Sequence, residues 1–225
     1  MLDQSVEQEI SKIMNTLHVN RIEGQAAQPY YNRFAHLYDL GEFIRRGTRR
    51  KVVQMSGWKP GETVLDLCTG TGELALTFAS LGARVIGTDI ARPMLKRASA
   101  KRMKLGASWL EMDSTHLAIA DQAFDVSVLS LALHHMPEAV QLRVLRELKR
   151  VTGRRIVIIE PDVPVKPNWI PAWVFVATII DESEYMHEWV HQDLIATCES
   201  VGLRVEAQEV STFGLHRMLL CDPMH

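Results

Sequence analysis

The stretch that most constrains this chain is Thr63 to Asp89, TVLDLCTGTGELALTFASLGARVIGTD. Its pattern predicts, in order, a buried strand, a glycine loop, a helix and a second buried strand that precedes Asp89: Val64–Leu67, Cys68–Gly72, Glu73–Leu81 and Arg84–Gly87. Parallel strands joined in this way need a crossover helix, and the loop then lies at the carboxyl end of the first strand. The stretch therefore predicts an α/β domain with a ligand site at that edge of its sheet.

The glycine loop is typical of a site where a ligand approaches the backbone closely. Gly70 and Gly72 lack a Cβ, so the loop can adopt positive φ and present its N–H groups. Asp89 stands where a carboxylate after the second strand binds both hydroxyls of a ribose. With Ala75, the two glycines also satisfy the G-x-G-x-x-A pattern of dinucleotide-binding proteins. The loop alone therefore leaves open a nicotinamide dinucleotide or another ribose-containing cofactor.

Two further acids distinguish between these ligands. Asp66 lies inside the end of the first strand, where a negative charge disfavours a pyrophosphate and suits a cationic ligand. Asp113 follows the third predicted strand, Ala107–Met112, where it can accept a hydrogen bond from an exocyclic amine. Acids at three successive strand ends suit a ligand with an amino group, a ribose, an adenine and no phosphate. S-adenosylmethionine is such a ligand.

At these residues the chain resembles the class I S-adenosylmethionine-dependent methyltransferases of the small-molecule type, including those of ubiquinone and menaquinone biosynthesis. VLDLCTGTGELA is similar to their glycine motif, VIGTDIARPMLKRA to their ribose-acid segment, and EMDSTHLAIADQAFDVSVLSLALHHMP to their third and fourth strand ends. The resemblance implies an α/β fold with a Rossmann-like, seven-stranded, mostly parallel sheet, helices on both faces and a C-terminal antiparallel hairpin. The remaining strands and helices are expected at Met94–Met103, Phe124–Leu131, Glu138–Val151 (ended by Gly153), Arg155–Glu160, Gln192–Gly202, Leu203–Phe213 and His216–Cys221.

The resemblance also implies which residues bind S-adenosylmethionine and its product S-adenosylhomocysteine. The expected cofactor contacts are Tyr31, Tyr38, Asp66, Cys68, Thr69, Gly70, Thr71, Gly72, Asp89, Ile90, Met94, Asp113, Ser114 and Ser130. Candidates for a general base or a substrate contact near the transferred methyl group are His134, His135 and Glu160. Each assignment has a structural alternative: core packing for the tyrosines and Met94, a loop cap for Asp113, and structural roles for the two histidines and Glu160.

The remaining segments predict a lid and a substrate wall. Residues 1–50 are expected to form an N-terminal helical lid or cap, and residues 51–225 the S-adenosylmethionine-binding domain. The arginines between Arg33 and Arg50 are interpreted as a solvated helix face. Aromatic residues crowd the apolar stretch from Val163 to His191, which predicts either a wall for a hydrophobic acceptor or a helix packed on the sheet. His187 and His191 share a helix face but have no evident third ligand, so no metal site is expected.

Composition limits the partners and the location. A net charge of −2 over 225 residues gives no general attraction to nucleic acid or to an acidic membrane. The amino terminus does not resemble a signal peptide, no apolar run is long enough for stable membrane insertion, and none of the three cysteines has metal spacing. These features favour a cytoplasmic protein with reduced thiols and leave a homodimer open.

The predicted function is SN2 transfer of a methyl group to a small hydrophobic or aromatic acceptor, without nucleic acid as a partner. The alternatives are an NAD-dependent oxidoreductase, which the G-x-G-x-x-A pattern supports, and a non-catalytic cofactor-binding protein that acts through a partner.

Overall fold

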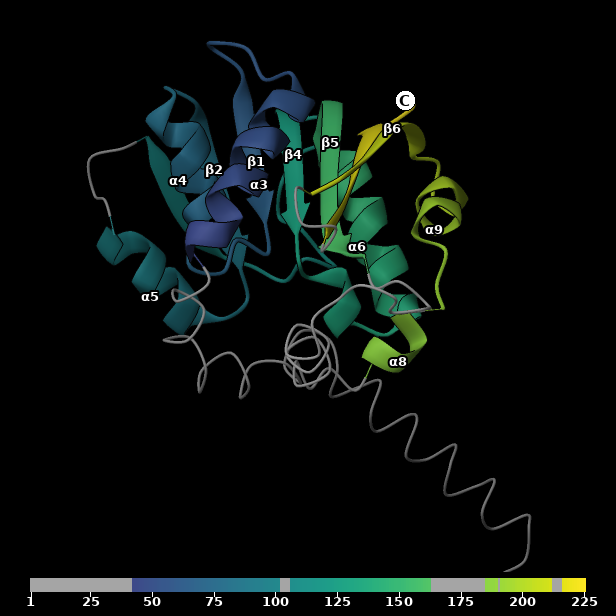
Figure 1. Ribbon diagram of the computed structural model, residues 1–225. Coiled ribbons are helices and arrows are strands. Elements are labelled where there is room, and N and C mark those ends of the chain that lie inside the picture. Colours follow the sequence, from purple (N-terminus) through teal and green to yellow (C-terminus); the bar gives the residue numbers. More distant parts are fainter. Residues whose placement is uncertain (1–41, 102–105, 163–184, 190, 212–215) are drawn as a thin grey trace, which may run out of the picture.

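The computed structural model describes residues 42–101, 106–162, 185–189, 191–211 and 216–225. Figure 1 shows the helices and strands that these residues form, with the labels used below. In chain order they are α3 Glu42–Ser56, β1 Thr63–Leu67, α4 Glu73–Ser80, β2 Arg84–Asp89, α5 Arg92–Lys101, β3 Ala107–Glu111, β4 Phe124–Ser130, the 3-10 helix η1 Leu133–His135, α6 Glu138–Val151, β5 Thr152–Pro161, α8 Met186–Trp189, α9 Leu194–Ser200, β6 Arg204–Val210 and β7 His216–Asp222.

The strands form one seven-stranded sheet in the order β3-β2-β1-β4-β5-β7-β6. Strands β1 to β5 pair in parallel, whereas β7 pairs antiparallel with both β5 and β6. The predicted α/β sheet with an antiparallel C-terminal pair is therefore confirmed. The strand order reverses between β1 and β4, which is where open α/β sheets form a crevice at the carboxyl ends of their strands.

The core lies on both faces of this sheet because successive strand residues point to opposite sides. On one face, β4 and β5 residues such as Val128 and Val157 pack with Val52 of α3 and Phe78 of α4. On the other face, Leu129, Ile156 and Ile158 pack with Leu145 and Leu148 of α6 and with residues of α9. A parallel sheet covered on both sides needs apolar residues on both sides of each strand, which explains the uninterrupted apolar run Ile156–Ile159 of β5.

The largest boundary difference lies between α6 and β5. Helix α6 ends at Val151 as predicted, but Gly153, which was expected to follow it as a stop signal, lies within β5, which begins at Thr152 and not at the predicted Arg155. Thr152 makes this junction with no intervening loop, since its buried Oγ1 lies 2.6 Å from both the Leu148 carbonyl oxygen and Ser127 Oγ of β4. Gly202, by contrast, ends α9 as predicted, with a positive φ of 79° and an N–H that donates to the Glu199 carbonyl.

Several predicted features lie outside the described residues. These are Tyr31 and Tyr38, most of the expected 1–50 segment, the aromatic stretch at 163–184 and the side chain of His187. Helix α3 runs through residue 50, where the sequence placed a domain boundary. In the described ranges, no helix is long and apolar enough to cross a membrane, and no group of three or more His, Cys, Asp or Glu side chains is arranged to bind a metal.

Candidate active site

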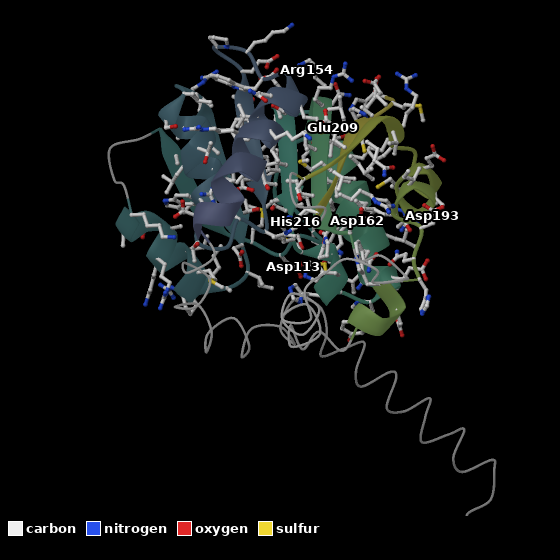
Figure 2. The ribbon with its side chains drawn as sticks, in the orientation of Figure 1. Asp113, Arg154, Asp162, Asp193, Glu209 and His216 are labelled. Atoms are coloured by element: carbon white, nitrogen blue, oxygen red, sulfur yellow. The ribbon has the colours of Figure 1, made fainter. Side chains whose placement is uncertain are left out.

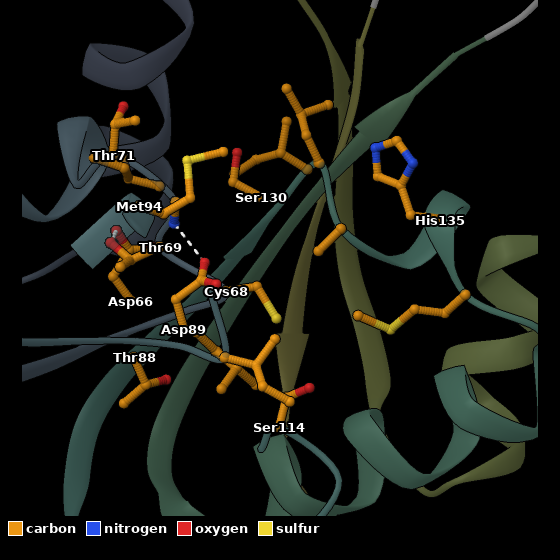
Figure 3. A pocket seen from close by; sticks show the side chains of 18 of the residues that line it. Asp66, Cys68, Thr69, Thr71, Thr88, Asp89, Met94, Ser114, Ser130 and His135 are labelled. Atoms are coloured by element: carbon orange, nitrogen blue, oxygen red, sulfur yellow. Dashed lines mark hydrogen bonds between the residues drawn. The ribbon is translucent and has the colours of Figure 1, made fainter. Parts of the chain in front are cut away.

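A cavity of about 220 Å³ opens at the carboxyl ends of β1, β2, β3 and β4. Figure 2 shows Asp113 and Asp162 at this edge of the sheet, with Arg154 at the opposite edge. The cavity brings together most of the predicted site residues: Asp66, Cys68, Thr69, Gly70, Thr71, Asp89, Ile90, Met94, Asp113, Ser114, Ser130 and His135. In Figure 3, Thr69, Asp89 and Met94 lie on one side of the cavity and His135 lies across from them.

Asp89 is tied to the glycine loop. Its Oδ2 accepts a hydrogen bond of 2.8 Å from the Gly70 N–H (dashed in Figure 3), and its Oδ1 accepts one of 2.8 Å from the Ala91 N–H. Burial raises the pKa of Asp89, and these backbone donors act in the opposite direction. Each carboxylate oxygen has two lone pairs, so each can also accept from a ligand hydroxyl. The contacts fix the orientation of this carboxylate at the cavity and leave lone pairs for a ligand.

The two loop glycines have different surroundings. Gly70 lines the cavity with a φ of 55°, and a Cβ at this position would meet no atom within 4 Å. A Cβ on Gly72 would lie 2.4 Å from Trp109 Cη2 and 2.8 Å from Ala98 Cβ. Gly72 was assigned to cofactor binding, but it is not among the residues that line the cavity. Its missing side chain makes room for the indole of Trp109 in β3.

Asp66 is a buried acid beneath the loop, with an exposed fraction of 1%. Its Oδ2 accepts a 2.5 Å hydrogen bond from Thr69 Oγ1 and a 3.0 Å hydrogen bond from the Ala75 N–H. Burial, with a smaller contribution from the negative charge of nearby Asp89, raises the pKa of Asp66 to about 7. A cationic group in the cavity would favour the ionised form of Asp66.

Asp113 is a loop cap that also lines the cavity. Its Oδ1 accepts hydrogen bonds of 2.8 Å from both the N–H and the Oγ1 of Thr115, which is a loop cap. Asp113 nevertheless lines the cavity beside Ser114, Ile90 and Met94, so the cap leaves it within the candidate site.

The three candidate catalytic groups are separated by the cavity wall. His135 lines the cavity, whereas His134 and Glu160 have exposed fractions of 2% and 0% and are not among the lining residues. His134 Nδ1 lies 2.6 Å from Glu160 Oε2, so these two side chains form a buried pair behind the wall. Of the three candidates for a base or a substrate contact, the structure therefore places only His135 at the cavity among the described residues.

Several lining residues were missed by the sequence analysis. Arg49 of α3 was interpreted as part of a solvated helix face, yet it is half-buried and lines the cavity with Thr48. The His135 end is mainly apolar and includes Leu131, Met136, Pro137, Val140 and Ile159. Two polar rings from distant segments, Tyr185 and His216, also line it. No local motif marks Tyr185 or His216, since only the folded topology brings the residue before α8 and the start of β7 to this edge.

Strain also concentrates around the cavity. Among the described residues, Cys68 and Leu131 are two of four non-glycine residues with positive φ, at 57° and 54°. They follow β1 and β4, the strands between which the sheet order reverses, and both line the cavity. Backbone of this kind is typical of ligand-binding sites. Together, the sheet order, the antiparallel β7 and the acid-lined cavity define a nucleoside-cofactor-binding α/β protein of the methyltransferase class.

Comparisons with known proteins agree with this class. Residues 64–154 match the family model described as a methyltransferase domain. A demethylmenaquinone methyltransferase of Thermobifida fusca is 32% identical over 206 residues, covering 84% of this chain and 85% of that protein. The chain belongs to the class I S-adenosylmethionine-dependent methyltransferases.

Two further comparisons show how much of a relative the chain matches and which solved structure shares its fold. A demethylmenaquinone methyltransferase of Paenarthrobacter aurescens is 36% identical over 143 residues, which cover 63% of this chain and about half (54%) of that protein. The crystal structure of an S-adenosylmethionine-dependent methyltransferase from Aquifex aeolicus superposes with a TM-score of 0.66 at 22% identity, covering 86% of this chain and 98% of that one. Neither the fold nor these relatives support the dinucleotide-dependent oxidoreductase.

Proposed function

We propose that this protein transfers a methyl group from S-adenosylmethionine to a small, ring-containing hydrophobic acceptor of the naphthoquinol type. The observation that carries the proposal is the gathering of Asp66, Asp89 and Asp113 around one cavity whose far end is apolar. The relatives named demethylmenaquinone methyltransferases support this acceptor class. The reduced, quinol form is proposed because the ring must be electron-rich to act as the nucleophile.

The lining residues fit this cofactor. The tethered Asp89 would bind the ribose hydroxyls, and Asp113 the adenine amine beside Ile90 and Met94. Asp66 would face the amino group of the methionine moiety. Arg49, a cation at the same cavity, would bind its carboxylate, because a guanidinium matches a carboxylate in both charge and geometry. Tyr31 and Tyr38 remain proposed contacts at this end.

The bound sulfonium supplies a methyl group that is already activated, so the protein's task is mainly to align the acceptor and exclude water. Alignment alone can lower a barrier by roughly 7–11 kcal/mol. The apolar residues around Met136 and Val140 would bind the acceptor ring and exclude water. His135, the nearest of the three candidates to the cavity, would take the proton that the acceptor loses when its new C–C or O–C bond forms.

We further propose a cytoplasmic location and leave a homodimer as the oligomeric state to be tested. The three cysteines are unpaired, which agrees with a reducing compartment. Light scattering of the purified protein would decide between monomer and homodimer.

A labelled-cofactor assay tests the function. The purified protein is incubated with S-adenosylmethionine carrying a tritiated methyl group and, separately, with short-chain demethylmenaquinol, tRNA or bulk protein. We expect the label in the extracted quinol. Label only in tRNA or protein would overturn the proposed acceptor class. Calorimetry that shows binding of S-adenosylhomocysteine, with no transfer to any quinol or phenol, would instead support a non-catalytic cofactor-binding protein.

A further inference from the structure

The carboxylate of Glu160 lies at the end of β5 and is completely buried. Its Oε1 accepts hydrogen bonds of 2.9 and 2.8 Å from the N–H groups of Ala132 and Leu133. Its Oε2 lies 2.6 Å from His134 Nδ1. If one of these partners were lost, a buried polar group would be left unpaired, which is unfavourable, and more so for a charged group. A single side chain thus connects three consecutive residues after β4.

These residues belong to a segment, Leu131–Met136, that forms one wall of the cavity. We call it the β4 exit segment, and Leu131, Ala132, His135 and Met136 all line the cavity. It begins with the positive φ of Leu131, whose N–H donates a 2.7 Å hydrogen bond to the Ile159 carbonyl, and continues into η1. Strained backbone persists only where its surroundings fix it. Ile159 holds Leu131, and the adjacent Glu160 holds the three residues that follow it, both from behind the wall.

Ring contacts link His134 to His135, which lines the cavity. The rings of His134 and His135 have centroids 3.9 Å apart at an interplanar angle of 41°. Trp189 of α8 lies edge-on to His134 at 6.0 Å, and its Nε1–H donates to the Pro161 carbonyl over 3.3 Å. The ring of His135 therefore packs against an imidazole whose position is set by Glu160 and Trp189.

We infer that Glu160 is a positioning residue which, through His134, fixes the β4 exit segment and the ring of His135 in the acceptor half of the cavity. Neither Glu160 nor His134 contacts the substrate. The acceptor role of this wall rests on the proposed function, whereas the positioning itself does not. Misplacement by about 1 Å can slow a reaction about a hundredfold, so disturbing this pair should lower turnover more than cofactor affinity.

Two variants distinguish the effect of the Glu160 carboxylate from that of the His134 ring. Glu160→Gln keeps the shape but removes the charge, and its amide must donate where the carboxylate accepted, so the His134 proton moves to Nε2. His134→Asn retains an N–H donor for Glu160 but removes the ring that packs on His135. The matched control is Ser127→Ala, which breaks another buried polar pair between β4 and β5, Ser127 Oγ with Thr152 Oγ1 at 2.6 Å, away from the exit segment.

Three measurements are made on the full chain: amide hydrogen exchange at Ala132 and Leu133, the ¹⁵N shifts of the imidazoles, and turnover of short-chain demethylmenaquinol. For Glu160→Gln we expect exchange at least tenfold faster, an inverted His134 tautomer and kcat about a hundredfold lower, with the Kd of S-adenosylhomocysteine within about threefold of wild type. His134→Asn should keep the amide protection and lose turnover, and Ser127→Ala should match the wild type in all three.

Unchanged exchange at Ala132 and Leu133 together with an unchanged tautomer in Glu160→Gln would overturn the inference. So would a loss in Ser127→Ala as large as that in Glu160→Gln, because any buried polar pair would then have the same effect. If the wild-type protein methylates no quinol, the proposed function fails separately, and the exchange and tautomer measurements still decide whether Glu160 is a positioning residue.

Discussion

Individual carboxylates in this site are positioned by backbone N–H groups before any ligand binds. Asp89 is the clearest case, because its two oxygens accept from Gly70 in the glycine loop and from Ala91 at the start of α5. Because Asp89 is already held in place, less side-chain entropy is lost when a ribose binds to it. It also means that one substitution affects both the ligand and the loop.

Replacing Asp89 with asparagine should therefore weaken cofactor binding strongly. The amide loses the charge and turns one N–H toward a backbone donor. Hydrogen bonds to a charged group contribute about 1.5–3 kcal/mol, so we expect the Kd of S-adenosylhomocysteine to rise roughly 10-fold to 150-fold in calorimetry. Asp125→Asn is the control, since Asp125 accepts from the Thr63 N–H at the opposite edge of the sheet. Equal affinities in the two variants would remove Asp89 from the site.

Residue types alone predicted the acids of the site but not which of two neighbouring histidines faces the cavity. Acids that follow apolar strands must come together at one sheet edge, so Asp66, Asp89 and Asp113 could be placed from the sequence. His134 and His135 are adjacent in a 3-10 turn that directs one ring into the core and the other into the cavity. That choice depends on Glu160, which lies on another strand and whose partner no local pattern reveals.

At the scale of elements, the junction of β1 and α4 serves two purposes through its two glycines. Gly70 leaves open space at the cavity, while Gly72 leaves room for Trp109 of β3. The first function concerns the ligand, and the second concerns how closely a helix can approach the sheet.

Alanine at the two positions should separate these functions. Gly72→Ala combines a left-handed alanine with overpacking against Trp109, so we expect a loss of roughly 2–4 kcal/mol in the free energy of unfolding, measured with urea. Gly70→Ala should lose only roughly 1–2 kcal/mol but reduce cofactor affinity more than Gly72→Ala does. Adding Trp109→Leu should restore part of the stability lost by Gly72→Ala. A larger stability loss at Gly70 than at Gly72 would contradict these assignments.

Elements buried on both faces were the most predictable part of the fold. The apolar runs of β1, β4 and β5 can only be central strands, and α6 was predicted with its observed bounds, Glu138–Val151. The early start of β5 was missed because Thr152 joins helix and strand without a loop, and its contact with Ser127 depends on a neighbouring strand.

At the scale of the whole molecule, the buried Asp66 couples stability to cofactor binding. Its pKa of about 7 in the folded protein exceeds the ordinary value of 3.8, so between these values the folded state retains a proton that the unfolded chain releases. Stability contributed by this group is therefore fully present below about pH 4, falls as the pH rises toward 7, and levels off above it. A pKa shift of this size corresponds to a change of roughly 4 kcal/mol in the free energy of unfolding across this pH range.

Asp66→Asn should remove this pH dependence, because an asparagine oxygen still accepts from Thr69 and Ala75 without ionising. Between pH 5 and pH 8 we expect the Tm of the cofactor-free wild type to fall relative to that of Asp66→Asn. The affinity of the wild type for S-adenosylmethionine should rise over pH 6–8, with proton release in calorimetry, because the cationic cofactor favours the carboxylate. Asp125→Asn serves as the control, since Asp125 is exposed and its pKa lies below the ordinary value, so it is ionised throughout this range. Parallel Tm curves for wild type and Asp66→Asn, with no proton release on binding, would show that Asp66 is ionised in the free protein.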